Sequence, residues 1–111
     1  MDANERKATV RNHALALEQE IRSIHMPHVT TGRDTDFVNF IVVGKENDGG
    51  RRDNHRRLVI HIKGEPGHWL YDLEYRHTLA RIPADAVILD RDLAHTMVAV
   101  SDFLKVEALA A

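Results

Sequence analysis

The chain has 111 residues, of which 43% are hydrophobic and 29% charged, a balance typical of a globular domain and not of a disordered or fibrous chain. This length suits one domain over residues 1–111 and is too short for two independent cores. The formal net charge of −2 argues against general affinity for nucleic acid or anionic membranes. The absence of cysteine excludes disulfide scaffolds, cysteine nucleophiles and cysteine-ligated metal sites.

Two further features argue against export and membrane insertion. Residues 1–7 are not followed by the apolar stretch that a signal peptide requires. Purely apolar runs reach only four residues, as at 40–43, far below the length of a membrane span. We therefore expect a cytoplasmic protein without membrane contacts, and no motif in the chain calls for a cofactor.

Two amphipathic helices are predicted, one near each end of the chain. The first covers residues 5–25 and ends before Pro27, because the residue before a proline disfavours helical geometry. Its apolar residues recur at helical spacing, which places them on one face. They are Val10, Ala14, Leu17, Ile21 and Ile24. The second helix is predicted over 91–108 with Asp90 as its N-cap. Its apolar stripe consists of Leu93, Met97, Val100 and Leu104.

Between these helices the period of the apolar residues changes to that of β-strands. Residues 37–43 are rich in β-branched and aromatic types, and residues 58–63 and 68–76 alternate. Pro66-Gly67 suits the centre of a type II turn, so the last two segments should form a hairpin. Residues 84–89 could form a short fourth strand or a helical turn.

The element order α-β-β-β-(β)-α predicts an α+β fold in two layers. An antiparallel sheet of three to four strands would carry the N- and C-terminal helices on one face. The sheet residues expected to meet the helices are Leu58, Ile60, Ile62, Trp69, Tyr71 and Leu73.

The opposite sheet face is predicted to be charged. With Pro66-Gly67 as a two-residue loop, His61 lies opposite Asp72 and Glu74 opposite Val59. Opposite charges at cross-strand distance stabilise one another. Such a face suits either a solvated surface or a protein-binding one. Its members are His61, Lys63, Asp72, Glu74 and Arg76.

Charge is unevenly distributed in the rest of the chain. Residues 84–111 contain five acidic and two basic side chains, a net charge of −3, which could steer a basic partner. Residues 44–57 contain no apolar residue and should form a mobile polar loop. Its arginines could contact phosphates. They are Arg51, Arg52, Arg56 and Arg57.

These features favour a small non-enzymatic protein that acts by stoichiometric protein binding. A bacterial immunity protein, an antitoxin-like inhibitor or an adaptor would fit, with a basic toxin or enzyme as its partner. Self-association is left open, since a sheet face or the strand at 37–43 could pair with a second copy to form a homodimer. The predicted contact residues are His61, Lys63, Asp72, Glu74, Arg76, Asp90, Asp92 and Asp102.

The alternative is a small nucleic-acid-binding protein or a metal-dependent nuclease that uses the loop arginines with His61 and Lys63. A lysine late in the second of three antiparallel strands, between flanking helices, resembles the core of PD-(D/E)xK nucleases. In that family two carboxylates hold magnesium beside the lysine. Here His61 stands two residues before Lys63, where the family has an acid, and Asp36 is the acid before the first strand. No metal site is predicted, because the eight histidines lack ligand spacing.

Overall fold

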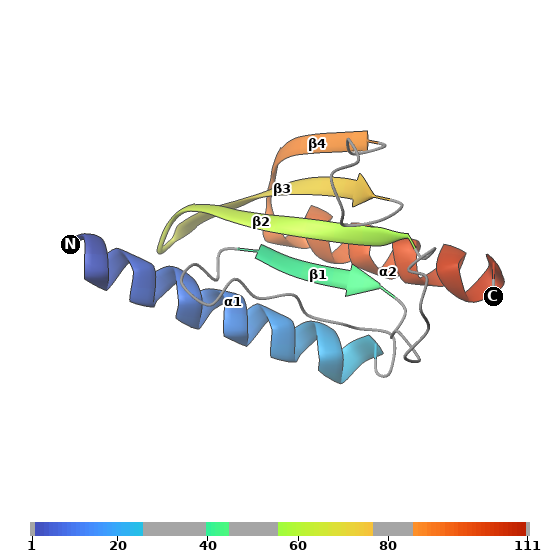
Figure 1. Cartoon of the computed structure of the whole chain (residues 1–111), viewed down its shortest axis with the longest axis horizontal. Helices are drawn as coiled ribbons and strands as arrows, with labels where there is room; N and C mark the ends of the chain where they lie inside the picture. The colour runs from blue at the N-terminus through green and yellow to red at the C-terminus, as the bar shows by residue number, and fades with distance from the viewer. Residues whose placement is uncertain (1, 26–39, 45–55, 77–85, 111) are drawn as a thin grey trace, which may run out of the picture.

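Two helices cover one face of a four-stranded antiparallel sheet (Figure 1). The computed structural model describes residues 2–25, 40–44, 56–76 and 86–110. Strands neighbouring in the chain also neighbour in the sheet, in the order β1-β2-β3-β4. The predicted α+β fold is confirmed, and the segment near 84–89 provides a fourth strand. The elements are α1 (Ala3–His25), β1 (Phe40–Gly44), β2 (Arg57–Glu65), β3 (His68–Arg76), β4 (Ala86–Arg91) and α2 (Leu93–Ala110).

Several predicted boundaries are corrected. Asp92 caps α2, not Asp90, because the amide of His95 donates to the Asp92 carboxylate over 2.8 Å. Asp90 belongs to β4. Most of the predicted loop 44–57 lies outside the described residues, but its two ends, Gly44 and Arg57, are strand residues.

The β2–β3 hairpin has the predicted register. Glu65 pairs with His68, so Pro66 and Gly67 form a two-residue loop. The proline ring fixes a negative φ at the first central position, and Gly67 supplies the positive φ of 85° that a type II turn needs at the second. The hairpin therefore fixes which side chains of β2 and β3 share a face.

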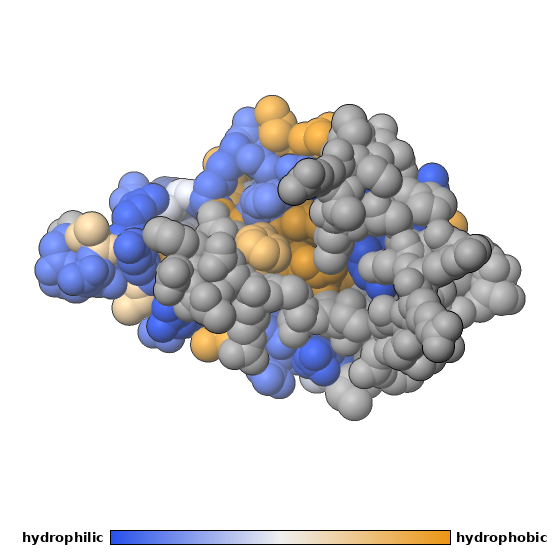
Figure 2. Space-filling view, viewed as in Figure 1, coloured by the Kyte–Doolittle hydropathy of each residue, from blue (hydrophilic) through white to orange (hydrophobic). Residues whose placement is uncertain are grey.

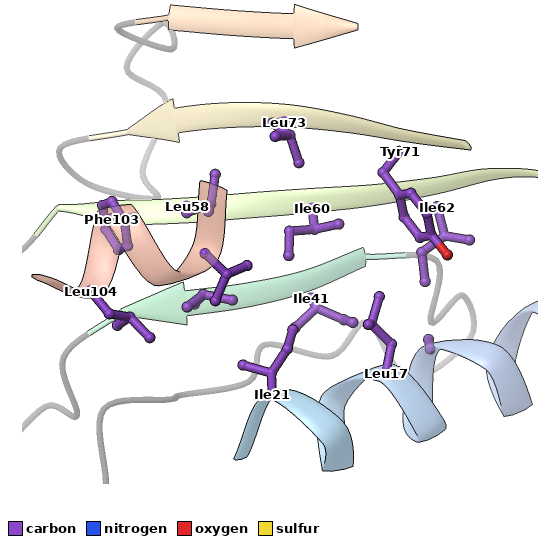
Figure 3. Packing of buried hydrophobic residues seen from close by; sticks show 13 residues of the cluster. Leu17, Ile21, Ile41, Leu58, Ile60, Ile62, Tyr71, Leu73, Phe103 and Leu104 are labelled. Atoms are coloured by element: carbon purple, nitrogen blue, oxygen red, sulfur yellow. The ribbon is translucent and has the colours of Figure 1, made fainter. Parts of the chain in front are cut away.

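The core lies between the sheet and the two helices. Figure 3 shows Leu17 and Ile21 of α1 beside Ile41 of β1, and Phe103 and Leu104 of α2 near the β2 end that carries Leu58. The six sheet residues expected to meet the helices all belong to this core or pack against it.

The helix stripes were predicted less accurately than the sheet face. Ile24 and Leu93 are exposed, although both continue the apolar periodicity. They lie in the terminal turns of their helices. The side chains there still lie on the apolar face of the helix, but no other part of the core packs against them. Phe103, which was not predicted, is buried because the apolar stripe of α2 is wider than one row.

His13 packs against the core at the end nearest the β2–β3 hairpin. The His13 ring of α1 stacks on Trp69 of β3, with ring centroids 4.5 Å apart and an interplanar angle of 5°. Its Nε2 lies 2.7 Å from the hydroxyl of Tyr71, a fully buried residue. Burial lowers the pKa of His13 and so favours its neutral imidazole, whose Nε2 shares a hydrogen bond with the Tyr71 hydroxyl.

We expect His13 to make folding stability depend on pH. Since the folded-state pKa lies below 6.5, the unfolded chain binds more protons just below that pH. The free energy of unfolding should therefore fall as pH drops through 6.5 and level off below the folded-state pKa. Chemical denaturation between pH 5 and 7.5 measures this, and His13→Gln should show a flatter dependence. A constant difference between the two proteins across that range would contradict the assignment.

Candidate functional site

The sheet face turned away from α1 and α2, here called the outer face, gathers the predicted charged residues. The view of Figure 1 looks onto this face, with α2 behind the sheet. Strand alternation and register place all five predicted sheet-face residues here, together with Asp90 of β4. They are His61, Lys63, Asp72, Glu74 and Arg76.

The charges on β2 contact their partners diagonally. His61 lies opposite Asp72 in the register, yet its Nε2 is 3.1 Å from Glu74 Oε1, at ion-pair distance but not hydrogen-bonded. Lys63 lies opposite Leu70, yet its Nζ is 2.8 Å from Asp72 Oδ1. In both cases the contacted residue of β3 is the next one on the same face beyond the register partner, a diagonal contact that the twist of a sheet allows. The predicted register of His61 opposite Asp72 is confirmed, and the ion-pair contact of the His61 ring is with Glu74.

Lys63 joins two carboxylates. Besides Asp72 its ammonium contacts Asp90 of β4, and these hydrogen bonds raise the pKa of Lys63. Burial acts to raise the pKa of Asp72, but the hydrogen bonds from Lys63 and from the Asp90 amide outweigh it and hold that pKa below its usual value. Arg76 pairs with Glu74 through its Nε at 2.8 Å. The middle of the outer face is thus a neutralised band of ion pairs.

Asp90 sits at an irregularity of the edge strand. Tyr71 pairs with Arg91 and Leu73 with Ile88, so Leu89 and Asp90 together oppose Asp72 in a β-bulge. Asp90 has a φ of 58°, a conformation that aspartate adopts more readily than most residues. Asp72 Oδ1 accepts its amide hydrogen over 2.9 Å and so supports the bulge.

Apolar side chains are exposed beside this band. Val87 and Leu89 of β4 are 53% and 58% exposed, and Leu70 of β3 is 37% exposed. Alternation along the strands places all three on the outer face. Figure 2, which shows this face, has apolar surface at its upper edge, where β4 lies. Val87 and Leu89 were missed because an apolar run such as that of residues 86–89 is typical of a buried strand.

The remaining predicted acids lie in two places. Asp92, exposed, follows β4 directly, caps α2 and contacts His95 Nδ1 at 2.7 Å. Asp102, also exposed, lies on α2 at the opposite end of the sheet, beside Arg56 and Arg57. Asp92 therefore lies next to the acidic residue Asp90 of β4, whereas Asp102 is not part of this surface.

Of the four arginines of the alternative prediction, the structure describes Arg56 and Arg57. Arg57 is the first residue of β2 and only 3% exposed, so it is no part of a polar loop. Arg56 precedes it and is exposed. Arg51, Arg52 and the acid Asp36 lie outside the described residues. Within the described ranges, no three His, Asp or Glu side chains come together as a potential metal site.

Comparison with known proteins adds nothing to this geometry. No protein-family model, curated protein or solved structure matches the chain. Among the described residues, no helix has the length and apolar character needed to cross a membrane. We call Leu70, Val87, Leu89, Asp90 and Asp92 the β4 patch.

Proposed function

We propose that the protein acts without catalysis, by binding one partner protein through the β4 patch in a stoichiometric complex. The observation that carries this proposal is the exposure of Leu70, Val87 and Leu89 together on adjacent strands, bordered by carboxylates. Single exposed apolar residues are common on protein surfaces, whereas contiguous ones with a polar rim are typical of binding sites.

The charge of the patch indicates a basic partner. Lys63 contacts both Asp72 and Asp90, so one positive charge faces two negative ones. Asp92 adds a third carboxylate two residues after Asp90, and with Arg91 between them these five charged groups have a net charge of −1. A basic enzyme or toxin is thus the partner class, and an immunity protein or antitoxin-like inhibitor is the type of function that we propose.

The bulge favours contact through side chains and not through strand addition. An added strand needs a regular row of free backbone groups along β4. The bulge at Leu89 and Asp90 interrupts that row. Bulges of this kind on edge strands hinder pairing with a further strand. The partner would therefore lie against the outer face, where the apolar side chains of β4 point.

Affinity capture from host lysate, with and without nuclease, identifies the partner, and purified proteins then test the surface. We expect Leu89→Lys to weaken the complex by about 30-fold or more, the effect of losing an interface hot spot. Val98→Lys is the matched control, because Val98 is 60% exposed on α2 and outside the patch. Asp90→Asn with Asp92→Asn should slow association at low salt and much less at high salt.

Two results would oppose the proposal. Equal affinities for Leu89→Lys and Val98→Lys would remove the β4 patch from the interface. Loss of every captured protein on nuclease treatment would favour the nucleic-acid alternative, and a cleavage assay of Lys63→Ala would follow.

A further inference from the structure

The β-bulge of β4 places two successive residues on the same face of the sheet. Side chains that follow one another in a regular strand point to opposite faces. In β4, however, Leu89 and Asp90 both lie opposite Asp72, a residue of the outer face. Leu89 is 58% exposed and Asp90 contacts Lys63 of that face. The outer face therefore presents an apolar side chain and a carboxylate from adjacent positions of the chain.

Without the bulge, Leu89 and Asp90 would be separated. If the register at the start of β4 continued without a shift, Asp90 would lie opposite Tyr71. Tyr71 is 1% exposed and belongs to the core, on the face that the helices cover. The Asp90 carboxylate would then point to that face, where burying a charge is costly. The shift in register is thus what keeps Asp90 on the same face as Leu89.

Lys63 connects the bulge to both neighbouring strands. Its Nζ lies 2.8 Å from Asp72 Oδ1 of β3 and also contacts the carboxylate of Asp90. The Asp90 amide donates to the same Asp72 Oδ1 over 2.9 Å. We call Lys63, Asp72 and Asp90 the lysine clamp. Since β3 separates β2 from β4, the Lys63 side chain reaches across the middle strand.

The backbone of Asp90 depends on such contacts. Its φ of 58° lies in the left-handed region, which is unfavourable for residues other than glycine even though aspartate tolerates it better than most. Backbone in such a region persists only where surrounding contacts hold it. If Lys63 were absent, the carboxylates of Asp72 and Asp90 would also repel each other, so the bulge would lose part of what stabilises it.

We propose that Lys63 is the positioning residue of the β4 patch: its ammonium group holds Asp90 in the bulge and so keeps Leu89 and Asp90 together on the side that meets the partner. This inference rests on the proposed binding through the β4 patch. Lys63 acts through Asp72 and Asp90, and its own contact with the partner is not required.

The sign of the effect on binding distinguishes positioning from charge. Removing Lys63 makes the outer face more negative, which by itself would strengthen binding to a basic partner. Positioning predicts weaker binding, because a bulge that is no longer held does not present Leu89 and Asp90 in one fixed arrangement. We expect Lys63→Met to raise the dissociation rate of the complex about fivefold or more.

Two further variants serve as controls for this measurement. Lys63→Arg should restore most of the affinity, because a guanidinium group can also contact two carboxylates. Lys105→Met removes the same charge from an exposed position on α2, outside the β4 patch, and should leave the dissociation rate unchanged.

Hydrogen exchange of the free protein tests the lysine clamp without the partner. We expect the Asp90 amide, followed by NMR, to exchange about fivefold or more faster in Lys63→Met than in the unchanged protein, since the contacts that hold its acceptor are lost. Lys105→Met should show the original rate. Amides of the β2–β3 ladder should keep their protection in both variants, which shows that the fold is retained.

The two measurements together separate this inference from the proposed function. Faster exchange with weaker binding, restored by Lys63→Arg, supports the positioning role. Unchanged exchange at Asp90 would overturn it, whatever the partner does. Faster exchange with equal or tighter binding, in a complex that Leu89→Lys weakens, would also overturn it but leave the proposed function intact. Equal binding of Leu89→Lys and Val98→Lys would remove the proposed function and, with it, the role of Lys63.

Discussion

Replacing Gly64 by alanine is expected to lower the free energy of unfolding by roughly 2–5 kcal/mol, the sum of left-handed backbone strain and overpacking. Gly64 has a φ of 92°, and a Cβ atom there would lie 2.4 Å from the carbonyl oxygen of His68. That oxygen belongs to the backbone of β3, so it cannot move without disturbing the hairpin. Chemical denaturation of the two proteins measures the difference.

Gly67 offers a control within the same hairpin. Its φ of 85° imposes similar strain, but a Cβ atom would meet nothing within 4 Å. Gly67→Ala should therefore cost only about 1–2 kcal/mol, the strain alone. Equal losses for the two alanine variants would show that the contact with His68 plays no part.

Replacing Ile21 by alanine should lower the free energy of unfolding by about 2–5 kcal/mol, the usual cost of an isoleucine removed from a core. Ile21 is fully buried, at 0% exposure, between α1 and the sheet. The substitution would leave a cavity, because the closely packed neighbouring side chains can move only partly to fill it.

Ile24 provides the matched comparison, with the same residue type one helical turn further along. It is 58% exposed, so Ile24→Ala should change the free energy of unfolding by about 0.5 kcal/mol or less. Denaturation curves of both variants are the measurement. A loss for Ile24→Ala as large as that for Ile21→Ala would mean that α1 is covered along its whole length.

The same pair of isoleucines illustrates what periodicity can predict. Helical spacing gives the direction of a side chain, and both residues share one direction. Whether a neighbouring element lies there depends on the lengths and positions of other elements. Local signals were sufficient for the β2–β3 register, because Pro66 and Gly67 permit few turn geometries and strand alternation then assigns each face.

Much of the candidate site could not be predicted, for the same reason. The sequence pattern placed Lys63 and Asp72 on one face, but the diagonal ion pairs depend on sheet twist. The bulge at Asp90 and the exposure of Leu89 depend on β4 lying at an edge.

The order of the strands has a consequence for how the chain folds. Each strand pairs with the next one along the chain, so the sheet requires closure of only short or moderate loops. Local pairing of this kind is associated with rapid folding. The core, by contrast, needs α1 and α2 from opposite ends of the chain. We therefore expect the hairpin to form early and the joint docking of the two helices to limit the folding rate.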